Sequence, residues 1–341
     1  GSAPYDFLRG PQEKSLHLYA NKVLIQRDCK DLLPEYLRFV KGVVDTIDLP
    51  LNVSREITQS SPVMGKINGI LTSEILSFIR NWAEKEPELY KKFYSNFGKM
   101  LKIGINTDYK NRDRIIELMR FESSAGKSGE WVSFKEYSAR MKPEQKEIYY
   151  LAGVNREAIE KNPNLEYFKK NGIEVIFITD PVDVFILPGI TEFDKKPVKS
   201  AERSDISILP SDLIEKPGDN LSTALVKRFK EILKDKVEDV KISKRLVESP
   251  VTLVGSKDSF DPQMEKVLEA MHKEFTRGKR ILEINVDHPL MSNLAKIFMA
   301  DPGSPMIEKC ALQLYEGALF TEGTLLPSSD FMKRMVDIME K

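Results

Sequence analysis

The segment that most limits the possible folds is IEVIFIT, residues 173–179, which is apolar at nearly every position. A strand with this pattern is covered on both faces, whereas a strand with one face in water alternates apolar and polar residues. A second strand is predicted at 147–152. Short helices are predicted around the two strands, at 134–141, 156–161 and 165–170. We therefore expect a small α/β layer unit over residues 126–204.

A run of helices is expected before this unit, over residues 61–125. From residue 62 to residue 104, apolar residues recur every three or four positions, which is the period of an amphipathic helix. Pro87 divides the run, because proline is favoured in the first turn of a helix and disfavoured inside one. A third helix is predicted at 112–121. Together these segments predict a helical coil.

The first part of the chain, residues 3–60, is expected to form a partial large α/β unit. Residues 16–26 predict one strand of a sheet whose other strands lie partly outside this fragment. An apolar stripe over 31–44 predicts a helix. The loop LPLNVSRE, residues 49–56, follows, and Pro50 stiffens it because its ring fixes the backbone angle φ.

The last third of the chain is expected to fold as a separate domain, residues 221–341. Residues 205–220 hold prolines, a glycine and charges without a sustained period, so they are interpreted as a linker. Helices are predicted at 221–233, from 261 onward, at 306–320 and at 329–340, and strands at 237–242 and 251–255. Asp261 is a typical N-cap and Pro262 a typical first residue of a helix. The predicted fold class is therefore α+β, with several α/β domains.

Composition argues against several classes of function. Lys plus Arg and Asp plus Glu number 52 each, so no overall positive field attracts nucleic acid or an acidic membrane surface. No apolar run reaches the roughly 20 residues that span a bilayer. Cys29 and Cys310 lie far apart, without the spacing of a metal or redox site, so a cytoplasmic protein is the simplest interpretation.

The chain also lacks the motifs of a self-contained nucleotide enzyme. It has neither G-x-x-x-x-G-K-[ST] nor G-x-G-x-x-G after a strand, and GKSG at 126–129 lacks the first glycine and the preceding strand of a phosphate-binding loop. His17, His272 and His288 are isolated from one another in sequence, so no metal site is predicted.

Several segments together resemble the ninety-kilodalton heat-shock chaperone family, in its bacterial branch. They are YLRFVKGVVDTIDLPLNVSRE at 36–56, IYYLAG at 148–153, GIEVIFITDPVD at 172–183, TEFDKKP at 191–197, VKISKRL at 240–246 and SPVTLV at 249–254. With the closing helices, the likeness covers nearly the whole chain after residues 1–2, which are interpreted as a tag remnant. It implies a middle domain and a C-terminal domain, without the ATP-binding domain of such a chaperone.

The resemblance implies a catalytic role for the loop at 49–56. Arg55 is expected to reach the terminal phosphate of ATP, bound with Mg²⁺ in the N-terminal ATPase domain of the same protein, while Asn52 and Gln59 set the loop's conformation. A guanidinium suits this role because it stays charged and presents a planar fork of donors. From the residues alone, Arg55 could instead cap or pair with its own helix start. The fragment alone is expected to bind no cofactor and not to hydrolyse ATP.

The resemblance also implies a surface that holds non-native client proteins. It is formed by Phe260, Met264, Val267 and Leu268 on the helix that follows Asp261, and by Phe185 on the middle domain. Methionine adapts to many partner shapes, which suits a surface with many partners. The alternative is that this stripe, like most stripes at helical spacing, packs on its own domain.

The closing helices carry two apolar stripes, and the resemblance implies a homodimer joined through these helices. Leu314, Ala318 and Leu319 lie on one helix, and Met335 and Val336 on the other. A helical hairpin has too little interior to cover both stripes, so pairing with a second copy into a four-helix bundle is expected. Packing onto the preceding strands is the alternative.

These observations predict part of an ATP-dependent dimeric chaperone that binds unfolded or partly folded clients, with no nucleic acid and no membrane as partner. Two other classes stay open. One is a non-catalytic dimeric scaffold for a specific folded partner, and the other is a complete enzyme with an unrecognised carboxylate site.

Overall fold

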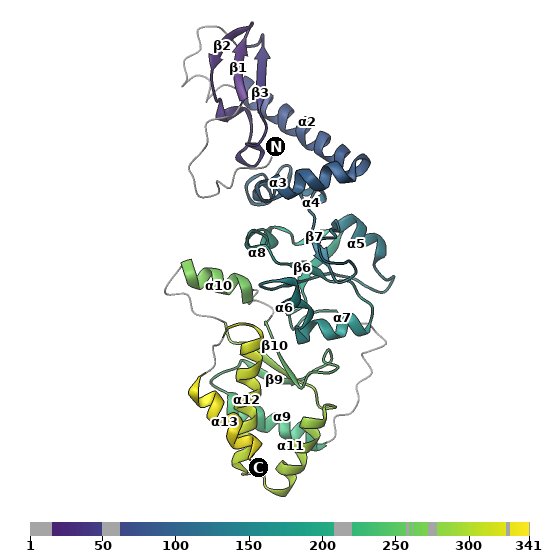
Figure 1. The fold of residues 1–341 in the computed structure, drawn as a ribbon, viewed down its shortest axis with the longest axis vertical. Coiled ribbons are helices and arrows are strands. Elements are labelled where there is room, and N and C mark those ends of the chain that lie inside the picture. Colours follow the sequence, from purple (N-terminus) through teal and green to yellow (C-terminus); the bar gives the residue numbers. More distant parts are fainter. Residues whose placement is uncertain are drawn as a thin grey trace. The chain divides into compact units, whose positions relative to one another are not determined.

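The computed structural model describes residues 16–49, 62–207, 220–256, 259–260, 262–271, 278–324 and 328–340. Helices and strands are mixed throughout this described part, which confirms the predicted α+β class (Figure 1). The chain divides into two compact units. Unit 1 comprises the residues up to Arg120 together with Ser133–Lys135 and Phe185–Ile190, and unit 2 comprises the remainder.

Unit 1 begins with a three-stranded sheet of order β2-β1-β3. The strands are β1 (Leu16–Ala20), β2 (Val23–Gln26) and β3 (Gly42–Thr46). The predicted single strand over 16–26 is wrong, because β1 and β2 form an antiparallel hairpin. Asn21 and Lys22 between them have φ angles of 48° and 66°. Positive φ at both central residues matches the right-handed twist of the two strands, and Asn favours this conformation.

The predicted helix over 31–44 is also wrong. The chain forms two short 3-10 turns there, η1 (Lys30–Leu32) and η2 (Glu35–Leu37), and then β3, which pairs parallel to β1. Leu33 is extended, at φ −142° and ψ 149°, because it precedes Pro34, and proline disfavours the helical conformation in the residue before it. The turns still bury three of the apolar residues of the stripe, which are Leu32, Tyr36 and Leu37.

Three helices complete unit 1, as predicted. They are α2 (Pro62–Lys85), α3 (Pro87–Thr107) and α4 (Arg112–Glu117), of which α4 ends earlier than expected. Arg114 of α4 donates a hydrogen bond from Nη2 to the Ser73 carbonyl oxygen of α2, at 2.8 Å. Gly104 lets α3 approach η2 and α4 closely, because a Cβ atom there would lie 2.9 Å from the Tyr36 ring and 2.7 Å from Ile115.

Unit 2 contains a five-stranded sheet of order β4-β6-β5-β8-β7. Its strands are β4 (Glu122–Ser123), β5 (Ile148–Ala152), β6 (Ile176–Ile178), β7 (Glu192–Phe193) and β8 (Lys196–Ser200). Strand β6 is the centre of the apolar segment at 173–179, and all of its residues are buried, as predicted for a strand covered on both faces. Strand β8 was not predicted, because its sequence, KPVKS, has no repeating pattern of apolar residues.

Short helices connect these strands. They are α5 (Phe134–Arg140), α6 (Arg156–Glu160), η3 (Pro163–Leu165), α7 (Glu166–Lys170), α8 (Pro181–Ile186) and η4 (Leu187–Gly189). Helix α5, helix α6 and the segment of η3 and α7 lie close to the predicted ranges. Asn155 caps α6 by accepting a hydrogen bond from the N–H of Ala158 at 2.9 Å, which supplies one of the bonds that a helix start lacks.

The C-terminal part of unit 2 is a second sheet, of order β10-β11-β9, covered by helices. The strands are β9 (Asp239–Ile242), β10 (Val251–Val254) and β11 (Ile281–Ile284). The helices are α9 (Asn220–Leu233), α10 (Pro262–Met271), α11 (Pro289–Ala300), α12 (Pro305–Thr321) and α13 (Ser329–Met339). Strand β11 and helix α11 were not predicted, whereas the other elements lie close to their predicted positions.

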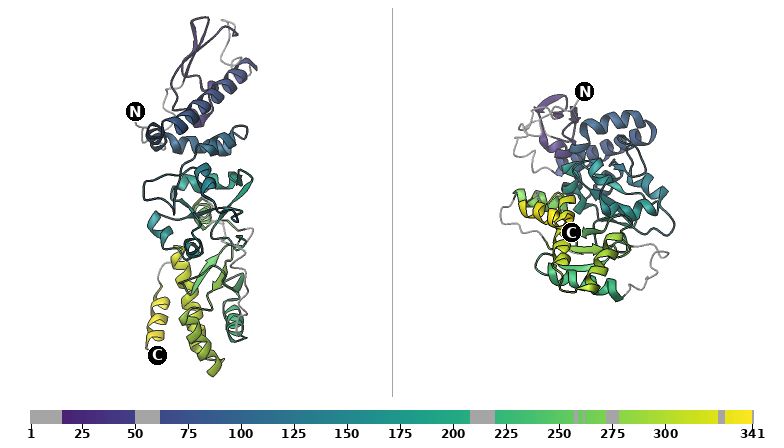
Figure 2. Two further views of the ribbon diagram at one scale, coloured as in Figure 1. Left: turned by 90° about the vertical axis from the view of Figure 1, so that its right-hand side faces the viewer. Right: turned by 60° about the horizontal axis from the view of Figure 1, so that its bottom comes forward.

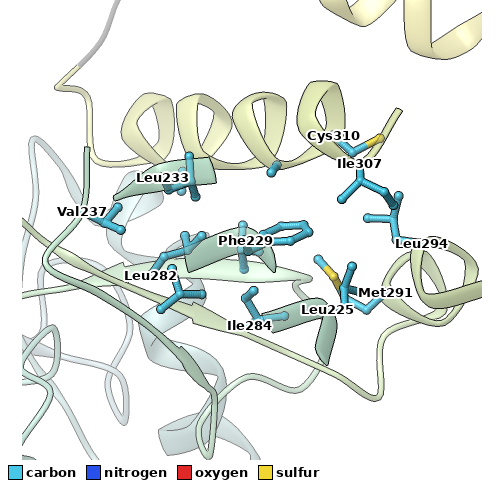
Figure 3. Packing of buried hydrophobic residues seen from close by; sticks show 14 of the residues in the cluster. Leu225, Phe229, Leu233, Val237, Leu282, Ile284, Met291, Leu294, Ile307 and Cys310 are labelled. Atoms are coloured by element: carbon cyan, nitrogen blue, oxygen red, sulfur yellow. The ribbon is translucent and has the colours of Figure 1, made fainter. Parts of the chain in front are cut away.

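One hydrophobic core joins these elements. Figure 3 shows Leu225, Phe229 and Leu233 of α9 packed with residues of β11, α11 and α12. Phe229 is fully buried at the centre. The core does not include a described residue of α10 or, apart from the partly buried Ile338, of α13. Helices α10 and α13 can therefore present apolar side chains on surfaces that face away from the core.

Candidate functional site

Arg55, Asn52 and Gln59 lie outside the described residues. The loop's chemistry therefore stays a prediction from its sequence. The structure describes the residues on either side, where Leu49 is buried and α2 begins at Pro62.

The start of helix α10 presents an aromatic side chain to solvent. Phe260 directly precedes the helix and is 52% exposed. Met264 and Leu268 are half-buried, and they follow Phe260 at intervals of four residues, which places them along one side of the helix. Val267 lies within α10, but its side chain lies outside the described part. An exposed aromatic next to partly exposed aliphatic side chains is a feature of interaction surfaces.

The other side of α10 is held by charged residues that sequence analysis did not find. Glu265 is buried and pairs with the buried Arg280, Oε2 to Nη2, at 2.7 Å. Arg280 also donates from Nη1 to the carbonyl oxygen of Phe260 at 3.3 Å, and its Nε lies 3.7 Å from Oε1 of Glu322 at the end of α12. Glu265 and Arg280 are 15 residues apart, so no sequence period connects them.

Phe185 lies in unit 1, at the end of α8, and is 41% exposed. The two apolar residues that follow it, Ile186 and Leu187, are buried. The backbone carbonyl of Phe185 accepts a hydrogen bond from Nδ2 of Asn106 at 2.8 Å, which ties this segment to α3. The structure therefore places Phe185 on the surface and its neighbours in the interior.

The three predicted dimerisation residues of α12 contact the core of their own chain. Ala318 is buried in that core, and Leu314 and Leu319 are partly buried against it. Their part in dimerisation stays a prediction.

Helix α13 is different, because none of its residues is buried. Val336 is 47% exposed and Met335 is half-buried, while Met332 and Met339 are also exposed. Figure 2 shows α13 running alongside α12 at the C-terminal end of the chain. This helix therefore carries an apolar face that the described residues do not cover.

Ion pairs fix α13 against α12. Lys309 of α12 pairs with Asp337 of α13 at 2.5 Å, and Arg334 of α13 pairs with Glu316 of α12. The rings of Phe320 and Phe331 pack with centroids 5.7 Å apart. Charged and aromatic residues make these contacts, while Met332, Val336 and Met339 of α13 remain exposed.

A network of hydrogen bonds connects the five-stranded sheet region to the C-terminal part of unit 2. The carboxylate of Glu166 in α7 accepts from the backbone N–H groups of Val247, Glu248 and Ser249, at 2.7 to 3.2 Å, and from Oγ of Ser249 at 2.5 Å. Burial raises the pKa of Glu166, but these donors outweigh burial and hold the pKa below its ordinary value. The carboxylate is therefore charged and bound at neutral pH.

Arg245 makes a second connection within unit 2. It is buried, and its guanidinium donates to the carbonyl oxygens of Ala201 and Arg203, both at 2.8 Å. Its Nε lies 3.1 Å from Oε2 of Glu283 in β11. A planar guanidinium suits this position because it donates in several directions at once.

The described residues give no indication of a metal or thiol site. No three His, Cys, Asp or Glu side chains in the described part lie close enough together to hold a metal ion. Cys29 and Cys310 are buried and are not joined in a disulfide, and burial raises the pKa of the Cys310 thiol, which disfavours the reactive thiolate. None of the described helices is both long enough and apolar enough to cross a membrane.

Comparisons with known proteins add to this geometry. The family model described as Hsp90 protein matches residues 2–341. Proteins described as chaperone protein HtpG from Chlorobium chlorochromatii and Chlorobium luteolum are each 52% identical to this chain over 334 residues, which is 97% of the chain and 52% and 53% of those proteins. The protein of the same description from Geobacter sulfurreducens is 41% identical over 329 residues, 94% of the chain and 50% of that protein. The chain thus spans about half the length of these relatives.

Proposed function

Because the chain belongs to the Hsp90 protein family, we propose that it supplies the middle and C-terminal parts of an ATP-dependent, dimeric chaperone that binds non-native proteins. The observation that carries the proposal is the 52% identity to HtpG chaperones over 97% of the chain. The two buried cysteines form no disulfide with each other, which is compatible with a protein of the cytoplasm, where thiols stay reduced.

The client surface in this proposal is centred on Phe260 and helix α10. Its support is chemical, because an exposed aromatic ring and adaptable Met and Leu side chains bind apolar segments without requiring one sequence. Phe185 is proposed as a second contact for clients, since it is exposed although the residues that follow it are buried. Folded proteins bury most such segments, so this surface would select non-native chains.

The catalytic part of the proposal concerns Arg55, with Asn52 and Gln59. Its support is the LPLNVSRE sequence and the family membership. ATP and Mg²⁺ are proposed to bind in the part of the relatives that this chain does not match, since the chain spans about half of their length. Nucleotide bound there supplies a terminal phosphate, and the Arg55 guanidinium would stabilise the charge that develops on its oxygens.

The dimer in this proposal forms through α13 together with α12. An amphipathic helix with no buried residue and exposed Met332, Val336 and Met339 has an apolar face that a second copy would cover. Two such hairpins related by twofold symmetry make a four-helix bundle, in which the same residues meet from both copies.

The test of the proposed function is suppression of aggregation. We expect the chain to reduce light scattering by several unrelated proteins as they unfold, and we expect Leu268→Asp to reduce this effect while the dimer persists. Binding of one native partner, with no effect on unfolding proteins, would contradict the proposal and would identify a scaffold instead.

A further inference from the structure

The charged residues beneath helix α10 connect three segments that are far apart in sequence. Arg280 directly precedes β11, Glu265 lies in α10, and Glu322 is the C-cap residue of α12. The side chain of Arg280 is only 6% exposed and that of Glu265 only 3%. The backbone of Arg280 is fixed as well, because its carbonyl oxygen accepts from the N–H of Glu238 at 2.8 Å. The guanidinium therefore projects from a fixed point of the C-terminal sheet.

The described residues of helix α10 lie outside the hydrophobic core of the C-terminal part. The hydrophobic core there includes residues of α9, α11 and α12 and no described residue of α10. Polar contacts hold the inner side of α10. Glu265 forms an ion pair with Arg280 at 2.7 Å, and Arg280 donates a hydrogen bond to the Phe260 carbonyl oxygen at 3.3 Å. A second bond runs from Nζ of Lys266 to the carbonyl oxygen of Glu322 at 2.7 Å.

Burying a charged pair is costly unless its geometry is good and its remaining donors are satisfied, and hydrophobic residues of the same size often stabilise a fold equally well. A buried pair at this position is therefore poorly explained by stability alone. The pair instead fixes the orientation of helix α10. The planar guanidinium of Arg280 donates at fixed angles, so it holds the start of α10, its first turn and the end of α12 in one arrangement.

We propose that Arg280 is a positioning residue, which through Glu265 and Glu322 orients α10 so that Phe260 faces solvent and which connects this helix to the dimerisation hairpin. The inference rests on the proposed function only for what α10 binds, since the orientation of the helix is a property of the chain itself. Two links lead to the hairpin, the 3.7 Å approach of Arg280 to Glu322 and the bond from Lys266 to the backbone of the same residue.

Hydrogen exchange of the backbone amides in the 341-residue chain tests this orientation without any client. In Arg280→Met, which keeps the apolar stem and removes the guanidinium, we expect the α10 amides to exchange at least tenfold faster while the α9 amides keep their rates. Arg280→Lys keeps the charge without the fork and should give an intermediate rate. Glu322→Gln should accelerate exchange in α10 although it lies outside that helix. The matched control is Lys230→Met, which removes an exposed ion pair of 2.6 Å with Asp239 in the same unit.

A double variant separates positioning from the penalty of an unpaired buried charge. Arg280→Met with Glu265→Leu removes both charges, so thermal stability should recover, but it cannot restore the contacts to the Phe260 carbonyl and to Glu322. We expect this variant to need several times more protein than the unmodified chain to halve the aggregation of an unfolding client. Full recovery of aggregation suppression, or unchanged α10 exchange in Arg280→Met, would overturn the positioning role. If the unmodified chain suppresses no aggregation, the proposed function fails, and the exchange rates alone still decide the role of Arg280.

Discussion

At the scale of single residues, buried and half-buried charges in this protein are paired with hydrogen-bond donors or acceptors. Glu166 accepts from three consecutive backbone N–H groups, Arg245 reaches two carbonyl oxygens and a carboxylate, and Glu265 faces Arg280. Each joins segments that are distant in sequence. Because a buried charge without partners is strongly unfavourable, such residues are sensitive positions.

Glu166→Gln is predicted to destabilise unit 2 by about 1–3 kcal/mol at pH 7, since the amide accepts fewer of the bonds that the carboxylate accepts. The pKa of Glu166 is lowered by folding, so its contribution is fully present above the ordinary value of 4.5 and is lost as pH falls through the lower value of the folded state. Urea unfolding at pH 7 and at a pH below 4.5 measures the free energy of unfolding before and after this contribution is lost.

The variant should lose less stability than the unmodified chain as the pH falls across that window. Glu157→Gln is the control, because that carboxylate pairs with Lys161 on an exposed surface and solvent screens the pair. Equal unfolding free energies for Glu166→Gln and the unmodified chain at pH 7 would contradict this account.

Arg55→Ala is predicted to lower ATP turnover of the full-length protein on the order of a hundredfold, because a guanidinium directed at a terminal phosphate acts mainly in the transition state. Arg55→Lys should recover only part of the rate, since an ammonium lacks the planar fork. Steady-state phosphate release is the measurement. Arg38→Ala, which removes an exposed arginine paired with Glu35 in unit 1, is the control. If the Arg55→Ala variant hydrolyses ATP as fast as the unmodified full-length protein, Arg55 has no catalytic role.

At the scale of helices and strands, sequence predicted well where one local signal dominates. Helices α2, α3 and α10 all begin at a proline, and proline is favoured in the first turn. The prediction at 31–44 failed because the apolar stripe is formed by two turns and a strand, with Pro34 preventing a continuous helix. Strand β11 was missed because its ILEI sequence is short, and short apolar runs fit a helix or a strand equally well.

The contacts of the candidate site were predicted only in part. Phe260, Met264 and Leu268 were found by their spacing and resemblance, and the structure shows Phe260 exposed. The Arg280 contacts were not found, because charges at helical positions usually face water and sequence does not show which distant residue they meet. The exposed face of α13 was predicted from its apolar stripe, whereas the ion pairs that orient it were not.

Val336→Asp is predicted to weaken the dimer at least a hundredfold, about 2.7 kcal/mol, because it would bury a carboxylate at the centre of the apolar face of α13. The monomer should remain folded, since no residue of α13 is buried within the chain. Sedimentation equilibrium measures the dissociation constant. Lys333→Gln, which changes the charge by the same one unit at an exposed position of the same helix, should have a much smaller effect. A Val336→Asp dimer as tight as the original would place the interface elsewhere.

At the scale of the whole molecule, the chain combines two units, each with its own sheet or sheets and helices. Family membership covers residues 2–341, and the relatives are about twice as long as the match. The proposed division of labour follows from this. In this proposal the chain would hold clients and pair with a second copy, while the nucleotide would be bound by the part of the relatives that lies outside the match.

The proposed binding of clients by the surface at α10 can be measured as the affinity of the chain for a permanently unfolded, reduced and alkylated protein. Phe260→Asp should raise the dissociation constant about tenfold, equivalent to roughly 1.4 kcal/mol, because the exposed ring is replaced by a charge that apolar segments do not bind. Phe78→Asp is the matched control, since Phe78 is a similarly exposed aromatic on α2 in unit 1. We predict that only Phe260→Asp weakens binding. Equal affinities of the unmodified chain and of both variants, or no binding by the unmodified chain, would contradict the account.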